Sequence, residues 1–197
     1  MKFVKIIIAD INHWKDDTEQ ILLQIAPCYV EKYRRTKILT DARQELVSGL
    51  LLKQYLGIER DEQLTYNAYN KPFLVLRDQY FNLSHSGDYV VLAIADCDVG
   101  IDIEKIITCH EATVKKVFST RQREQLLELD REERNEMFTR IWTEYEAMLK
   151  LKGTGFGEEW DKEKGPIDNC SIYTVKLGDY FLTCATEKKV SIVTERL

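Results

Sequence analysis

The segment 131–152 constrains the fold of this chain more than any other part of the sequence. Its apolar residues recur at intervals of three and four, the spacing of one face of an α-helix: Phe138, Ile141, Trp142, Tyr145, Met148 and Leu149. Asp130, followed by Glu133 three residues later, is a suitable start for this helix. An amphipathic helix buries its apolar stripe against another helix or a sheet. The chain must therefore supply a partner layer.

Strands are the predicted partner layer. Short segments rich in β-branched and aromatic residues, separated by turn residues, are typical of strands. They occur at 3–8, 64–69, 81–83, 89–95, 99–106, 171–176, 180–185 and 190–194. Leu177-Gly178-Asp179 predicts a hairpin between two of them.

Two further helix starts are predicted. Thr40 and Asp41, with Gln44 completing a loose capping box, begin a helix that Gly57 ends. Ser119 and Gln122 form a second capping box. Each half of the chain thus offers a long helix and several strands. We expect an α+β fold of two similar lobes in a pseudo-twofold arrangement, 1–98 and 99–197.

Charge and composition exclude some classes of function. A nonspecific nucleic-acid binder needs excess Lys and Arg to neutralise phosphates, but this chain has a formal net charge of −5. No apolar run approaches the ~20 residues of a membrane-spanning helix. We therefore expect neither nucleic acid nor membrane as a partner. The five cysteines include no C-x-x-C pair, which favours free thiols and a cytoplasmic protein.

Asp102 and Glu104 alternate with Ile101 and Ile103 in a predicted strand. Alternate residues of a strand face the same way, so the two carboxylates lie together, with Cα atoms about 6.6 Å apart. Such a pair repels unless a cation or water screens it. Oxygen ligands without His or Cys favour Mg²⁺. The alternative is a solvated strand face, which any single D-x-E pattern also fits.

The predicted helix 131–152 carries a second charged pair beside its apolar stripe. Glu146 and Lys150 are four residues apart and share one face. At a boundary between lobes they can face a ligand; the alternative is an ordinary surface ion pair. Tyr145 lies on the apolar stripe and is expected to pack in the core.

Two turn-like segments offer groups that suit phosphate. Ser84 and His85 precede a Gly-containing turn, and no G-x-S-x-G elbow supports Ser/His nucleophilic catalysis instead. Lys71 is held extended by Pro72, which fixes a cation suited to a phosphate. Taken alone, these segments are equally a capped strand end and a surface turn.

The order of these motifs is more specific than any one of them. N-x-x-x-K-P, F-N-x-S-H-S, V-G-I-D-I-E, F-S and W-T-x-x-E-A-x-x-K-x-x-G follow one another. Over about residues 66–156 this order resembles the 4′-phosphopantetheinyl transferase superfamily. The length is similar to that of the surfactin-synthetase-activating type, in which one chain carries two lobes. It differs from the shorter holo-acyl-carrier-protein synthase type, which forms trimers, so a monomer is implied.

The resemblance implies an activity and a set of site residues. Such enzymes cleave coenzyme A at its pyrophosphate, transfer the phosphopantetheine arm to a serine of an apo acyl or peptidyl carrier protein, and release adenosine 3′,5′-bisphosphate. The implied ligands of Mg²⁺, or of Mn²⁺ in its place, are Asp102, Glu104 and Glu146. The implied coenzyme A site is Lys32, Lys71, Pro72, Ser84 and His85. Lys150 would neutralise the pyrophosphate, and either Glu146 or a metal-bound water would take the serine proton.

Two residues depart from the family pattern. Tyr145 stands where the family commonly has Lys, and Asn70 stands where it commonly has Gly. Asn tolerates left-handed backbone angles, so the turn before Lys71 is expected to persist. The departures support a rival hypothesis, a non-catalytic module that binds coenzyme A or a carrier protein. Another Mg²⁺-dependent phosphotransferase is the second rival, although it would leave the Lys-Pro and Ser-His pairs without a role.

Overall fold

The computed structural model describes residues 2–14, 16–76, 79–154 and 170–197. The first half contains β1 (Phe3–Asp10), η1 (Ile11–Trp14), α1 (Thr18–Leu22), α2 (Pro27–Arg35), α3 (Leu39–Leu56), η2 (Asp61–Gln63), β2 (Leu64–Tyr66), β3 (Pro72–Leu74), β4 (Tyr80–Ser86) and β5 (Tyr89–Ala95). The second half contains β6 (Val99–Lys105), α4 (Glu111–Val117), α5 (Thr120–Glu128), α6 (Arg131–Lys152), β7 (Ser171–Leu177), β8 (Tyr180–Thr186) and β9 (Ser191–Arg196). The predicted α+β class is confirmed.

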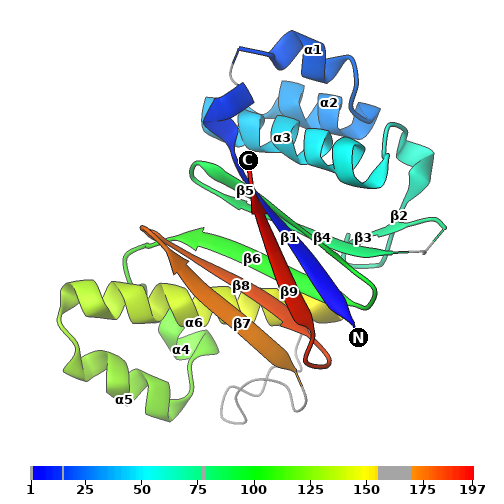
Figure 1. Cartoon of the computed structure of the whole chain (residues 1–197). Helices are drawn as coiled ribbons and strands as arrows, with labels where there is room; N and C mark the ends of the chain where they lie inside the picture. The colour runs from blue at the N-terminus through cyan, green and yellow to red at the C-terminus, as the bar shows by residue number, and fades with distance from the viewer. Residues whose placement is uncertain (1, 15, 77–78, 155–169) are drawn as a thin grey trace.

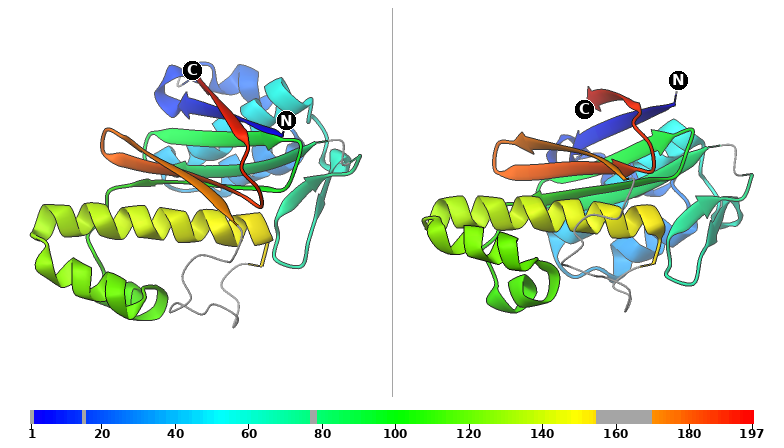
Figure 2. Two further views of the ribbon diagram at one scale, coloured as in Figure 1. Left: turned by 60° about the horizontal axis from the view of Figure 1, so that its bottom comes forward. Right: turned by 90° about the horizontal axis from the view of Figure 1, so that it is seen from below.

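Two sheets form the centre of the molecule. One has the order β4-β5-β1-β9 and the other β6-β8-β7, while β2 and β3 form a separate small hairpin. Helices α1 to α3 lie beyond the first sheet and α4 to α6 beyond the second, as Figure 1 and Figure 2 show. The order of layers is therefore helix, sheet, sheet, helix.

Strand β1 is buried on both faces because it lies inside this stack. Ile7 and Ala9 pack with the core residues of α3, whereas Ile6 and Ile8 pack against Ile101 and its neighbours in the second sheet. The near-continuous apolar run of β1 suits this position. None of the described helices is both long and apolar enough to cross a membrane.

The long helices follow their predicted ends with one exception. Helix α6 begins at the Asp130 cap, whose carboxylate accepts hydrogen bonds from the N–H groups of Glu132 and Glu133. The Ser119 capping box of α5 is also present. The predicted capping box of α3 is wrong: its N-cap is Ile38, and the amide of Gln44 instead donates to the carbonyl of Gly87, 2.8 Å away.

The sheets do not divide the chain at a single point. Strand β9 returns to the first sheet and pairs parallel to β1, with Phe3 beside Ser191 and Ile8 beside Arg196. The predicted strand 190–194 therefore exists, but its partner comes from the other half. The division into lobes 1–98 and 99–197 stays a prediction.

Candidate functional site

A cavity of about 410 Å³ lies between the two halves of the chain. Helices α2 and α3 and strands β3 and β4 provide one wall, and β6 and α6 provide the other. The lining residues are Tyr29, Lys32, Glu45, Ser48, Pro72, Asn82, Leu83, Ser84, His85, Asp102, Glu104, Trp142, Glu146 and Lys150. The structure thus brings together every predicted site residue except Lys71.

Close contact between β6 and α6 places the acidic residues in one wall. A Cβ atom on Gly100 would lie 2.0 Å from the carbonyl oxygen of Ala147 and 2.4 Å from the N atom of Leu151. Only glycine permits such an approach of strand backbone to helix backbone. The approach carries Asp102 on β6 toward Glu146 on α6.

The carboxylates of this wall influence one another. Burial and then the charge of Asp102 raise the pKa of Glu146 to about 7, although Lys150 opposes the shift. Burial and Asp102 also raise the pKa of Glu104, against hydrogen bonds from Ser86 and Trp142. The wall therefore disfavours the ionised forms of Glu104 and Glu146, chiefly through burial and secondly through the charge of Asp102.

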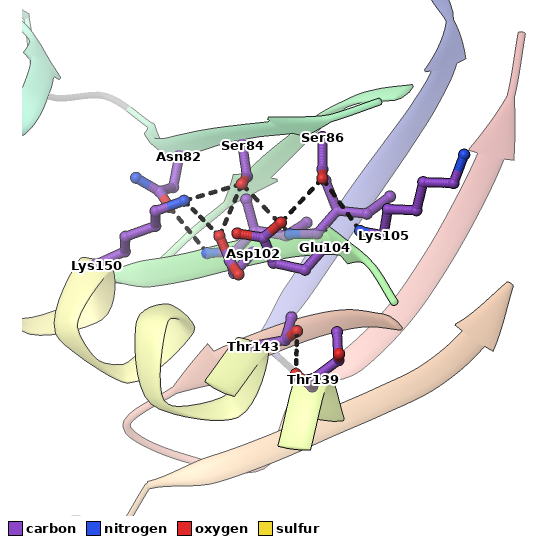
Figure 3. Close-up of polar contacts among 11 residues, drawn as sticks. Asn82, Ser84, Ser86, Asp102, Glu104, Lys105, Thr139, Thr143 and Lys150 are labelled. Atoms are coloured by element: carbon purple, nitrogen blue, oxygen red, sulfur yellow. Dashed lines mark hydrogen bonds and ion pairs between the residues drawn. The ribbon is translucent and has the colours of Figure 1, made fainter. Parts of the chain in front are cut away.

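Lys150 provides the cation that the wall contains. Its Nζ lies 2.7 Å from Asp102 Oδ1 and 2.9 Å from Ser84 Oγ (Figure 3). Asp102 is 3% exposed, and its other oxygen, Oδ2, has no hydrogen-bond partner. A buried carboxylate oxygen without a partner is unusual and suits a ligand or an ion.

The acidic residues are not gathered into a finished metal site. Across residues 2–14, 16–76, 79–154 and 170–197, no group of three His, Cys, Asp or Glu side chains is close enough to hold an ion. The donor set nevertheless fits Mg²⁺, because it consists of carboxylate oxygens and includes the unpartnered Oδ2 of Asp102. The metal-binding role of Asp102, Glu104 and Glu146 stays a prediction.

The opposite wall carries the groups predicted for the nucleotide. Lys32 Nζ lies 3.7 Å from Glu45 Oε2 and 4.5 Å from the centre of the Tyr29 ring. His85 as a whole residue is exposed, but partial desolvation of its imidazole at the cavity wall lowers its pKa. Lys150 and Lys32 add to this shift, whereas Glu45 and Asp41 oppose it. A neutral imidazole can both donate and accept a hydrogen bond near pH 7.

Lys71 is placed differently from its prediction. The side chain is 8% exposed, and its Nζ donates to the carbonyl oxygens of Leu151, at 3.0 Å, and Val99, at 3.3 Å. The last carbonyls of a helix lack intrahelical partners, and Lys71 supplies one at the end of α6. The residue therefore joins the β2–β3 hairpin to α6 and β6, and does not line the cavity.

The two departures from the family pattern have clear positions. Asn70 adopts the left-handed conformation, with φ of 63°, so the expected turn is present. The side chain of Asn67 braces it by accepting the N–H of Lys71 and donating to the carbonyl of Gly153. Tyr145 is 3% exposed and packs in the core beneath α6, as predicted. Tyr145 is not among the residues that line the cavity.

Several residues that line the cavity, and one hydroxyl next to them, have contacts that the sequence does not predict. Glu45 and Ser48 have no predicted role. Trp142 is predicted only as part of the apolar stripe, but it lines the cavity and donates a hydrogen bond to Glu104. The contacts of Asn82 and Ser86 with β6 are also not predicted, because the Ser86 hydroxyl is expected to contribute to a phosphate cradle. A signal for these two existed, because polar residues at 82, 84 and 86 alternate in the same way as Asp102 and Glu104.

Comparison with known proteins gives consistent matches. A family model described as the 4′-phosphopantetheinyl transferase superfamily matches residues 98–195, which include the whole acidic wall. The 4′-phosphopantetheinyl transferase psf-1 of Bacillus pumilus is 30% identical over 159 residues, covering 78% of this chain and 68% of that protein. The 4′-phosphopantetheinyl transferase Sfp of Bacillus subtilis (strain 168) is 28% identical over 176 residues, covering 86% and 79%. The 4′-phosphopantetheinyl transferase AcpT of Escherichia coli (strain K12) is 35% identical over 102 residues, covering 50% and 51%.

Proposed function

Because this chain belongs to the 4′-phosphopantetheinyl transferase superfamily, we propose that it transfers the 4′-phosphopantetheine arm of coenzyme A to a serine of an apo acyl or peptidyl carrier protein. The observation that carries the proposal is the cavity between the two halves. Its acidic wall, with Asp102, Glu104 and Glu146, faces a wall that offers Lys32 and His85. A pyrophosphate fits between such walls only with added positive charge, which Lys150 supplies in part.

The proposed reaction is a substitution at phosphorus. The serine oxygen forms a bond to the phosphorus that carries pantetheine, and the bond to the bridging oxygen breaks, which releases adenosine 3′,5′-bisphosphate. Either Glu146 or a water molecule at the metal site would accept the serine proton. The remaining contribution of the protein is positioning and charge.

Mg²⁺ is the proposed cofactor, and Mn²⁺ can replace it. Asp102, Glu104 and Glu146 would hold the ion, since hard carboxylate oxygens are its preferred protein ligands. When bound, it neutralises the pyrophosphate and the charge that develops on the departing phosphate. Lys150 orients the same wall from α6 through its contacts with Asp102 and Ser84.

We also propose that one chain is sufficient and that it acts in the cytoplasm as two similar lobes. Both walls of the cavity come from the same chain, which supports a monomer. All five cysteines are free thiols, which supports a reducing compartment. The carrier protein is the proposed macromolecular partner.

Intact mass spectrometry tests the activity directly. Incubation of a purified apo carrier domain with this protein, coenzyme A and Mg²⁺ should add the mass of one phosphopantetheine group. A chelator should stop the reaction, and excess Mg²⁺ or Mn²⁺ should restore it. A carrier domain with its acceptor serine replaced by alanine is the control. Coenzyme A binding without any gain of mass would instead identify a non-catalytic binding module.

The cavity wall that carries Lys32 and His85 predicts a preference for the 3′-phosphate of coenzyme A. Charge-assisted hydrogen bonds contribute about 1.5–3 kcal/mol each, so calorimetry should show coenzyme A binding at least about tenfold more tightly than its 3′-dephospho form. Lys32→Met should narrow this difference. Lys71→Met should leave it unchanged while lowering the melting temperature, because Lys71 binds carbonyl groups outside the cavity. Equal affinity of the unmodified protein for both compounds would remove Lys32 and His85 from this role.

A further inference from the structure

Strands β4 and β6 are the edges of two different sheets, and side chains make the hydrogen bonds between them. Asn82 Oδ1 accepts the N–H of Ile101 at 2.8 Å. Ser84 Oγ accepts the N–H of Ile103 at 3.3 Å, and Ser86 Oγ accepts the N–H of Lys105 at 3.1 Å. We call Asn82, Ser84 and Ser86 the β4 ladder. It satisfies the outward N–H groups of β6, which would otherwise lack partners at a sheet edge.

The two hydroxyl groups of the β4 ladder also hold the two carboxylates of β6. Ser84 Oγ donates to Asp102 Oδ1 at 2.8 Å, and Ser86 Oγ donates to Glu104 Oε2 at 2.9 Å (Figure 3). A serine hydroxyl has one proton to donate and lone pairs to accept. Each serine therefore accepts the N–H of one β6 residue and donates to the carboxylate of the residue that precedes this N–H donor in β6.

The repeat of this contact follows from strand geometry. Side chains two residues apart on β4 face the same way, as do the carboxylates two residues apart on β6. The hydroxyls and the carboxylates therefore have the same spacing along their strands, so the contact is repeated. Asn82, the remaining member of the β4 ladder, accepts only the N–H of Ile101. The residue before Ile101 is Gly100, which has no carboxylate.

Ser86 is the member of the β4 ladder whose role can be isolated. Ser84 lines the cavity and also contacts Lys150, so its replacement would disturb several groups. Ser86 does not line the cavity, and among the contacts described its only contact with a side chain of the acidic wall is its hydrogen bond to Glu104. On the other side, the indole N–H of Trp142 on α6 also donates to Glu104. Glu104 is thus held between two elements that belong to opposite walls.

We propose that Ser86 is a positioning residue, which fixes the Glu104 carboxylate in advance so that it can bind the divalent cation together with Asp102. This inference rests on the proposed function, because it assumes that a cation binds there. A carboxylate already held in place loses less rotational freedom when it binds an ion. Hydrogen-bond partners of metal ligands commonly change metal affinity or activity by about 10–100-fold when they are removed.

Mn²⁺ affinity of the full chain, measured by electron paramagnetic resonance with saturating coenzyme A, tests the proposal. Ser86→Ala should weaken Mn²⁺ binding by about tenfold or more. The Mg²⁺ concentration that gives half-maximal transfer should rise by a similar factor, whereas kcat at saturating Mg²⁺ should change by less than about threefold, because the loss is one of metal affinity. Ser86→Thr keeps the hydroxyl and should restore binding.

Thr186→Val is the matched control. Thr186 is a buried hydroxyl at the end of β8 that donates to the carbonyl of Lys188, away from the cavity. Replacing Thr186 by Val removes one hydrogen bond from the sheet that contains Glu104 and should leave Mn²⁺ affinity unchanged. A purely structural effect of removing a hydroxyl would instead appear in both variants.

The outcomes separate this inference from the proposed function. If the unmodified protein modifies the carrier domain and the Ser86→Ala variant binds Mn²⁺ with the same affinity as the unmodified protein, the proposed role of Ser86 is wrong and the proposed function stands. If Ser86→Ala weakens Mn²⁺ binding but no form modifies a carrier, the role of Ser86 stands and the function is wrong. If the unmodified protein binds no Mn²⁺ with coenzyme A present, the role of Ser86 is overturned.

Discussion

Glu146→Gln should reduce phosphopantetheine transfer by about 10³-fold or more while leaving the fold intact. Gln has nearly the shape of Glu but carries no charge, so it can neither hold a divalent cation strongly nor accept the serine proton. Single-turnover transfer to an apo carrier domain, followed by intact mass spectrometry, measures the effect. Asp102→Ala should be similarly inactive, because Asp102 is buried at the centre of the acidic wall.

Glu146→Gln should also stabilise the metal-free protein in a pH-dependent way. The pKa of Glu146 is raised from its ordinary 4.5 to about 7, so the folded state holds this proton more tightly than the unfolded state. The resulting stabilisation is present below pH 4.5 and is lost as the pH rises through 7. Because Gln does not ionise, Glu146→Gln should raise the melting temperature at pH 8 but not at pH 4.

Glu144→Gln is the control on the same helix. Glu144 pairs with Arg140 and does not line the cavity, so its neutralisation should leave transfer within about threefold of the unmodified rate, as surface ion pairs have little energetic effect. If Glu146→Gln and Asp102→Ala both transferred at unmodified rates, the acidic wall would have no part in the reaction.

Gly100→Ala should lower both stability and transfer. The added Cβ would lie 2.0 Å from the carbonyl oxygen of Ala147 and 2.4 Å from the N atom of Leu151, and both atoms belong to the backbone of α6. No side chain can move aside, so the strand and the helix must separate. Overpacking of this kind typically costs about 1–3 kcal/mol. A displacement of about 1 Å in the reacting groups can cost about 10²-fold in rate.

Denaturant unfolding and single-turnover transfer, both well below the melting temperature, measure these two losses. Gly57→Ala is the control, because Gly57 has a positive φ but nothing within 4 Å of its Cβ position. Its cost should be the ordinary strain of about 1–2 kcal/mol for an alanine in that conformation, with little change in transfer. Unmodified activity in a folded Gly100→Ala protein would show that the close approach of β6 to α6 is not needed.

Local sequence patterns predicted most elements of this fold. The predicted strand 89–95 and the long helix 131–152 match β5 and α6, because their apolar spacing matches their burial. Contacts that depend on residues far away in the sequence are not predicted by local patterns. Gln44 was predicted to cap its own helix but bonds Gly87 instead, because a tertiary partner competes with a local one.

The candidate site shows the same division. Asp102 with Glu104, and Glu146 with Lys150, were placed correctly on shared faces because strand and helix periods fix such pairs. The position of Lys71 could not be predicted, since the carbonyl groups that bind it belong to residues 28 and 80 positions away. Pairing across the chain follows from the assembled layers and has no local signature.

The pairing of β9 with β1 also determines the order of events during synthesis. Strand β1 is made before its parallel partner β9, which follows only after all the other described strands and helices. Until then, one edge of an apolar strand stays without its neighbour, a state that invites association with other chains. A nascent chain of this protein therefore completes the sheet β4-β5-β1-β9 only after the strands of the second sheet have been made, and shortening it before Ser191 should produce a product prone to aggregation.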